Sequence, residues 1–144
     1  DLIFSCTCFA DYNDRQMYVY QDVEKWASEG LIDELYPMIY AATAEEHIER
    51  ADEIAAGIGE SCRLVLGLGT YDGQTPEIVA EQAAYNRTAG GNGNSIFALP
   101  YTQVFGFDRL YAEGLYRTPA VHTDDCGAAM PAFLAELCET IDST

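Results

Sequence analysis

The feature that most constrains the fold is an alternation of short apolar runs with longer helical patterns along the chain. The run 62–69 is apolar at nearly every position, which is typical of a strand buried on both faces of a parallel sheet. Thr43 and Glu46 have the spacing of a capping box, and Thr75-Pro76 forms a second helix start. Strands that alternate with helices predict a parallel sheet with right-handed crossovers.

We expect about four strand-plus-helix units in series within residues 1–117, followed by a loop and a C-terminal helix within 118–144. The expected strands cover 2–9, 31–40, 62–69 and 95–99, and the main expected helices cover 22–29, 43–58, 75–89, 107–115 and 130–141. Two architectures use such units. One is part of an eight-stranded (β/α) barrel, whose usual length of about 250 residues exceeds this chain. The alternative is a small open parallel α/β sheet of the doubly wound kind.

Composition narrows the classes of function. The 144 residues carry a formal charge of -17 and are 49% hydrophobic, so the chain can bury a core but repels phosphate backbones and anionic lipid surfaces. We therefore expect no nucleic-acid partner. We also expect no membrane-spanning segment, because no apolar stretch approaches the roughly 18 residues that a membrane helix needs. The chain begins at Asp1 within an apolar run, which suggests a piece of a longer polypeptide.

Polar and aromatic residues follow each expected strand, where ligands of parallel α/β proteins bind. The candidates are Asp11 and Asp14 after the first strand, Tyr40 after the second, Tyr71 and Asp72 after the third, and Tyr101 after the fourth. Aromatic rings stack on the apolar faces of sugars, and carboxylates accept hydrogen bonds from hydroxyl groups. The set therefore favours a carbohydrate ligand at Tyr40, Tyr71, Asp72 and Tyr101, although ten tyrosines place several in loops by chance.

Glycoside hydrolysis usually requires two carboxyl groups, about 5 to 5.5 Å apart for retention and about 6.5 to 9.5 Å apart for inversion. The candidate pair is Asp11 or Asp14 with Asp72. The alternative is that all three lie in solvated turns, which is the commoner role of such residues.

Other motifs favour structural roles, so we expect neither a cofactor nor a metal. Gly67-Leu68-Gly69 lacks the third glycine of a dinucleotide-binding loop. The segment 122–126 contains His, Asp and Cys, but a compact loop accounts for it better than a metal site. His47 is expected to be exposed, opposite the apolar stripe of its helix.

Three successive units resemble the later half of the glycosyl-hydrolase-like family 10 barrels. Residues 22–40 match the pattern of this family. The pattern is Trp, then Glu-Gly, a hydrophobic residue and Asp, and then Pro-Gln, a hydrophobic residue and Tyr. The similarity continues through 66–71, Glu77-Ile78, Gln82, Asn86-Arg87 and 93–97, and covers roughly residues 2–115.

The resemblance implies the C-terminal half of a (β/α)8 barrel from a bacterial protein of the cell envelope or the extracellular space. It implies hydrolysis of peptidoglycan-type glycan or a related polysaccharide, with the isolated fragment inactive and the missing N-terminal half, or a second copy, as partner. Met38 replaces the usual Gln and Ala41 an aromatic residue, and both changes remove sugar contacts. The alternative is a non-catalytic carbohydrate-binding or surface-interaction domain.

Overall fold

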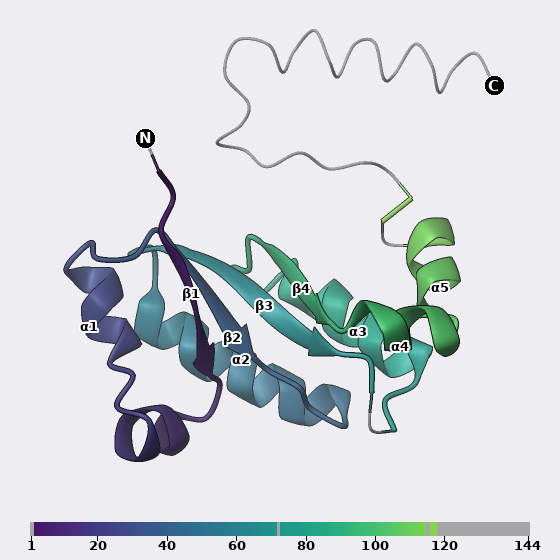
Figure 1. Cartoon of the computed structure of the whole chain (residues 1–144), viewed down its shortest axis with the longest axis horizontal. Helices are drawn as coiled ribbons and strands as arrows, with labels where there is room; N and C mark the ends of the chain where they lie inside the picture. The colour runs from purple at the N-terminus through teal and green to yellow at the C-terminus, as the bar shows by residue number, and fades with distance from the viewer. Residues whose placement is uncertain (1, 72, 115, 118–144) are drawn as a thin grey trace, which may run out of the picture.

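The computed structural model describes residues 2–71, 73–114 and 116–117, which form a four-stranded parallel sheet with helices packed along it (Figure 1). The strands are β1 (Ser5–Phe9), β2 (Glu34–Met38), β3 (Arg63–Gly69) and β4 (Gly93–Phe97). The helices are the π-helix η1 (Asp14–Tyr18), α1 (Val23–Ser28), α2 (Ala44–Ile58), α3 (Pro76–Asn86), α4 (Leu99–Val104) and α5 (Phe107–Glu113). The predicted alternation is confirmed as an open α/β arrangement.

The strands lie in chain order, β1-β2-β3-β4, and every neighbouring pair is parallel. In the described residues the order does not reverse, as it does at the switch point of a doubly wound sheet. Pro37 lies inside β2, opposite Cys8 of β1. Between β2 and β3, the register pairs only Glu34 with Arg63 and Leu35 with Leu64. Pro37 follows these paired residues, so its missing N–H removes no hydrogen bond from this part of the ladder.

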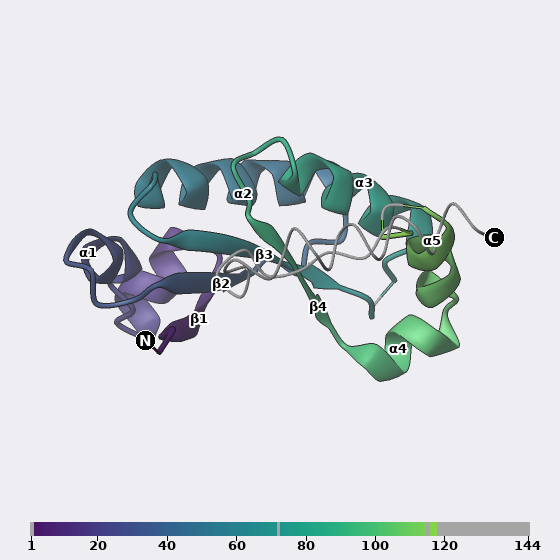
Figure 2. The same cartoon turned by 90° about the horizontal axis from the view of Figure 1, so that it is seen from above.

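One layer of helices covers one face of the sheet, with α1 beside α2 and α2 beside α3 (Figure 2). The main core lies between this layer and β1 to β3. Its fully buried large side chains include Leu35, Leu66 and Ile54. A second cluster joins Leu68 and Phe107, so that α5 packs against α3. Because side chains alternate along a strand, the other residues of each strand point to the opposite face.

The helix starts that the sequence predicts at Thr43 and Thr75 are confirmed by the structure. Thr43 Oγ1 accepts a hydrogen bond from the Glu46 amide at 3.2 Å, and the Glu46 carboxylate accepts one from the Ala42 amide at 3.2 Å. Thr75 Oγ1 accepts from the Ile78 amide at 3.4 Å. The two threonine hydroxyls thereby accept from amides that the first turn of a helix leaves unpaired.

The fourth strand and its sequel differ from the prediction. β4 starts two residues earlier than expected, and α4, with Pro100 in its first turn, lies where no helix was predicted. Proline is well placed there, because the first turn of a helix needs no amide donor. The predicted helix over 130–141 and the rest of 118–144 lie outside the described residues. Within the described part, no helix is long and apolar enough to cross a bilayer.

Candidate functional site

Five aromatic rings meet where β2, β3 and β4 end, and we call them the carboxyl-end aromatic cluster. Tyr40 and Phe97 are stacked, with centroids 5.6 Å apart and planes 19° apart. Tyr71 packs edge-on against both rings, at 5.8 Å from Tyr40 and 5.9 Å from Phe97. Tyr101 lies 6.0 Å from Tyr71 and stacks on Phe105 at 6.5 Å. The cluster is thus two pairs of nearly parallel rings joined by Tyr71.

Much of this cluster is exposed. Phe97, Tyr101 and Phe105 are 52%, 46% and 55% exposed, whereas Tyr40 and Tyr71 are half-buried. Burial, and secondarily the neighbouring Tyr71, raises the pKa of the Tyr40 hydroxyl, so it stays a neutral donor and acceptor at neutral pH. Exposed flat rings next to neutral hydroxyl groups can stack on a sugar and hydrogen-bond to it.

The structure brings together three of the predicted sugar-binding residues, Tyr40, Tyr71 and Tyr101. Phe97 and Phe105 were missed by the sequence analysis. Phe97 is the last residue of β4, a position where the register of the strand decides which face a side chain takes. Phe105 lies four residues after Tyr101, a spacing that places two side chains on the same face of a helix. The sequence analysis expected no helix between 99 and 107, so it did not connect these two rings.

Glutamine side chains join the loops that carry Tyr40 and Tyr71. Gln74 accepts a hydrogen bond from the Tyr71 amide at 3.1 Å and donates one to the Ala41 carbonyl at 3.1 Å. The fully buried Gln82 donates to the carbonyls of Ala41 at 3.2 Å and Thr43 at 3.0 Å. The backbone beside Tyr40 is therefore tied to the backbone of Tyr71.

A second link joins the ends of β3 and β4. The Thr70 amide donates to the Phe97 carbonyl at 2.9 Å, and Thr70 Oγ1 lies 3.2 Å from the Ala98 carbonyl oxygen. Thr102 Oγ1 lies 3.2 Å from the same oxygen and 3.3 Å from Thr70 Oγ1. Buried threonines thus fix the start of α4 against the end of β3, which sets the position of Tyr101.

The candidate catalytic carboxylates are located only in part. Asp11 and Asp14 are both exposed after β1, and Asp11 Oδ1 accepts a hydrogen bond from the Asp14 amide at 3.0 Å. This bond closes the turn that leads into η1, which is a structural role for Asp11. Asp72 lies outside the described residues. The catalytic roles of all three, and the sugar contact of Asp72, stay predictions.

The carboxyl end of β1 also holds a buried cation. Arg15 is 1% exposed, donates to the Ala10 carbonyl at 2.5 Å and pairs with the Glu24 carboxylate at 2.5 Å. Its guanidinium lies 5.2 Å from the centroid of the Tyr12 ring. These contacts join η1 to α1, and they hold the guanidinium of Arg15 inside the protein.

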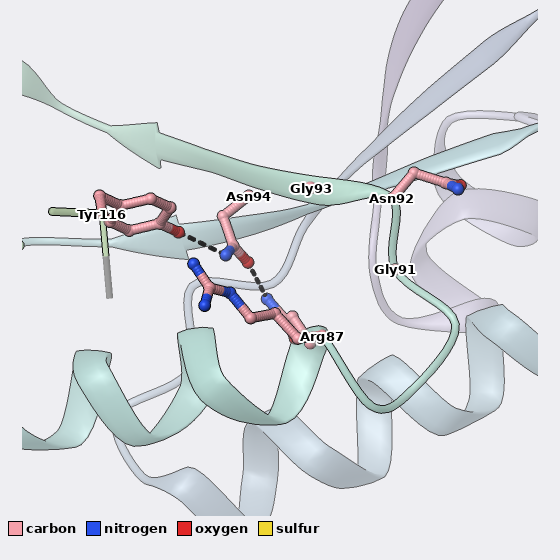
Figure 3. Close-up of a pocket in the computed structure, with 7 residues that line it drawn as sticks. Arg87, Gly91, Asn92, Gly93, Asn94 and Tyr116 are labelled. Carbon is pink, nitrogen blue, oxygen red and sulfur yellow. Dashed lines mark hydrogen bonds between the residues drawn. The ribbon is translucent and has the colours of Figure 1, made fainter. Parts of the chain in front are cut away.

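A pocket of about 230 Å³ lies at the opposite, amino end of β4 (Figure 3). Arg87 and Tyr116 point toward Asn94 there, and the guanidinium lies 5.4 Å from the centroid of the Tyr116 ring. Asn94 donates a hydrogen bond to the Tyr116 hydroxyl and accepts one from Asn86 Nδ2 at 2.6 Å. Two of these hydrogen bonds join lining residues to one another, while Asn92 Oδ1 accepts one from the Leu64 amide of β3 at 2.8 Å.

The Asn86 amide continues into the interior and reaches His47, whose Nε2 lies 2.6 Å from Asn86 Oδ1. His47 is fully buried, so the predicted exposure of this residue is wrong. The spacing contained the signal: His47 precedes the buried Ala51 by four residues and Ile54 by seven, and therefore shares their face of α2.

A broader pocket of about 580 Å³ is lined by loops at the amino ends of β2 and β3. Asp33 belongs to this end, where its Oδ2 accepts a hydrogen bond from the Phe4 amide at 2.7 Å. Among the described residues, no group of His, Cys, Asp or Glu is arranged to hold a metal ion. The segment 122–126 considered as a metal site lies outside them.

Comparisons of the chain with protein-family models, with curated proteins and with solved structures returned no match. Functional inference therefore rests on the geometry of the site and on the residues of the sequence.

Proposed function

We propose that this chain is the sugar-binding part of a glycoside hydrolase-like protein that acts on a bacterial cell-envelope polysaccharide of the peptidoglycan type. The observation that carries the proposal is the carboxyl-end aromatic cluster, which joins Tyr40, Tyr71 and Tyr101 across three strand ends. Several exposed rings at the end of a parallel sheet form a platform on which successive sugar rings can stack.

The half-barrel interpretation belongs to this proposal. A (β/α)8 barrel places its strands in chain order with all helices outside, and four strands in chain order with one helical layer fit half of it. The family resemblance supports the same view, as well as a location in the cell envelope or outside the cell. The partner is then an N-terminal half or a second copy, which would cover the edges at β1 and β4 that no other strand of the described residues pairs with.

A non-catalytic carbohydrate-binding domain is the second candidate. It is favoured by the hydrogen bond that holds Asp11 in a turn and by Met38, which stands where the resembled family has an amide. Release of reducing sugars from purified glycan strands by the longest native form of the protein separates the two candidates. An enzyme releases them continuously, and a binding domain does not.

The sugar-binding proposal is tested with Tyr101→Ala. Tyr101 is 46% exposed, so its removal costs little stability, while the loss of one stacking ring is expected to weaken glycan binding about tenfold. The measurement is isothermal titration with soluble glycan fragments. Tyr18→Ala is the matched control, because Tyr18 is 78% exposed on η1 and belongs to no contact of the cluster. Equal affinities for the two variants would contradict the proposal.

A further inference from the structure

The outer edge of β1 is occupied by a side chain instead of a strand. β1 and β4 form the two ends of the sheet, so each has one edge with which no strand of the described residues pairs (Figure 1). On β1, the Phe9 amide donates a hydrogen bond to Gln21 Oε1 at 3.1 Å, and Gln21 Nε2 donates one to the Thr7 carbonyl at 3.4 Å. One side-chain amide thus satisfies two backbone groups that point away from the sheet.

The two groups that Gln21 binds define the kind of strand that it replaces. In a parallel ladder, one residue of the neighbouring strand accepts from the amide after a given residue and donates to the carbonyl before it. Thr7 and Phe9 flank Cys8 in this way, and Cys8 itself is aligned with Pro37 of β2 on the other side. Gln21 therefore imitates one residue of a further strand that runs parallel to β1.

The chain contains one strand that matches this place. β4 has five residues, as β1 has, and its outer edge also lacks a strand neighbour in the described residues. The Asn92 amide donates to the Leu64 carbonyl of β3 at 2.7 Å. Because the backbone groups of successive residues point to alternate sides of a strand, the N–H and C=O of Ser95 point to the outer edge. β4 thus presents a parallel edge complementary to that of β1.

We propose that the strand that displaces Gln21 is β4 of a second copy of this chain, so that two copies close an eight-stranded parallel barrel. Until then, Gln21 occupies the edge of β1. This inference rests on the half-barrel part of the proposed function, and it commits the partner to a second copy. Each copy supplies one β1 and one β4 to a two-fold symmetric ring, and no sheet edge remains open.

Closure also extends the site. Phe9 and Tyr12 lie at the carboxyl end of β1 and are 42% and 49% exposed. Neighbouring strands are about 4.8 Å apart, so the pairing places these rings beside Phe97 of the other copy. The exposed carboxylate of Asp11 arrives at the same end. The carboxyl-end aromatic cluster of one copy thus continues onto the other and gains an acidic group.

Gln21→Ala tests the role of the side chain. Sedimentation velocity over a range of concentrations of the 144-residue chain, without sugar, measures the Kd of self-association. The monomer loses two hydrogen bonds in this variant, whereas the proposed dimer loses none, because β4 has already replaced Gln21. We therefore expect the variant to associate about tenfold more tightly than wild type. Added salt should strengthen association, because it screens the repulsion between copies that each carry a formal charge of -17.

The matched control is Gln103→Ala. Gln103 is an exposed glutamine on α4, outside both edge strands, and its removal should leave the Kd as in wild type. If Gln21→Ala associates no more tightly than Gln103→Ala, Gln21 does not stand in for a strand of a second copy and the proposal is wrong.

Proline substitutions in the Gln21→Ala background identify the strands that pair. Thr7→Pro removes an outward N–H from β1 and Ser95→Pro removes one from β4, while the ladders to β2 and β3 keep their donors. Each interface of the closed dimer joins one β1 to one β4, so either substitution weakens both interfaces. We expect both variants to stay monomeric where their parent dimerises. An equimolar mixture should associate again, because one interface of the mixed dimer joins two unsubstituted strands.

The remaining outcomes contradict the closed dimer. An effect of Ser95→Pro alone would mean that β4 pairs with β4, and an effect of Thr7→Pro alone that β1 pairs with β1. Far-ultraviolet circular dichroism checks that each variant is folded, and the comparison of Gln21→Ala with Gln103→Ala needs no proline. Glycan titration with Tyr101→Ala is independent of these measurements. A dimer that forms but binds no glycan would remove the sugar-binding function alone, whereas glycan binding by a strict monomer would remove this inference alone.

Discussion

At the scale of single residues, His47 shows how a titratable group is accommodated in the helical layer. It is fully buried on α2 and hydrogen-bonded to Asn86 of α3 at 2.6 Å. Burial lowers the pKa of its imidazole, and the bond to Asn86 opposes this effect only in part. The folded protein therefore prefers the neutral imidazole.

This preference predicts a pH dependence of stability. The unfolded chain binds a proton at His47 below its ordinary pKa of about 6.5, and the folded chain resists doing so. The stabilisation is therefore complete above that pH and is lost as the pH falls toward the lowered pKa of the folded state. We expect the free energy of unfolding, measured with urea from about pH 7.5 to 5, to fall more steeply for the wild type than for His47→Gln.

The comparison with His47→Gln cancels the contributions of the carboxylates and of His122, since both proteins share them. Parallel pH profiles would show that His47 is protonated as readily in the folded state as in the unfolded one.

At the scale of elements, the carboxyl-end loops are held by side-chain amides. Gln74 connects the loop after β3 to the loop after β2 through the Tyr71 amide and the Ala41 carbonyl. Gly69 leaves room for this side chain, because an added Cβ would lie 2.9 Å from Gln74 Nε2. The edge-on contact between Tyr40 and Tyr71 thus depends on a bridge between two loops.

Gln74→Ala removes this bridge. We expect a loss of about 1 to 2 kcal/mol in the free energy of unfolding, since two hydrogen bonds disappear while Gln82 still donates to the Ala41 carbonyl. The near-ultraviolet circular dichroism of the coupled tyrosines should also weaken. Gln103→Ala is the control, because Gln103 is an exposed glutamine on α4. A Gln74→Ala spectrum like that of wild type would mean that packing alone holds the rings.

At the scale of the whole molecule, negative charge works against folding. The formal charge is -17, and α2 carries the exposed Glu45, Glu49 and Glu53 at intervals of four residues. Like charges at this helical spacing repel each other by about 0.2 to 0.5 kcal/mol per pair. Salt screens such repulsion, with a Debye length of about 10 Å at 0.1 M.

We therefore expect the melting temperature to rise with sodium chloride. Glu49→Gln relieves two of the helical repulsions and should stabilise the protein by about 0.5 kcal/mol at low salt, with the gain shrinking in high salt. Differential scanning calorimetry at low and high salt measures both effects. A melting temperature that falls with salt would mean that the ion pairs outweigh the net repulsion.

The sequence by itself determined the alternation of strands and helices and most of the helix starts. These features depend on residues that are neighbours in the chain. The Thr43 hydroxyl accepts a hydrogen bond from an amide three residues away, and a run of apolar residues indicates a buried strand. Parallel strands all end at the same edge of a sheet. The strand assignments alone were therefore enough to place Tyr40, Tyr71 and Tyr101 at that edge.

Only the tertiary structure decided which of these residues meet. The contact of Tyr40 with Phe97 depends on the order and register of strands far apart in the sequence, and a shift of one residue would turn Phe97 to the other face. The hydrogen bond between His47 and Asn86 likewise joins two residues that are 39 positions apart, although the helical spacing of His47 already indicated its buried face. Local patterns specify elements because their interactions lie within a few residues, whereas the site is made of contacts between elements, which form only when the sheet and its helical layer pack together.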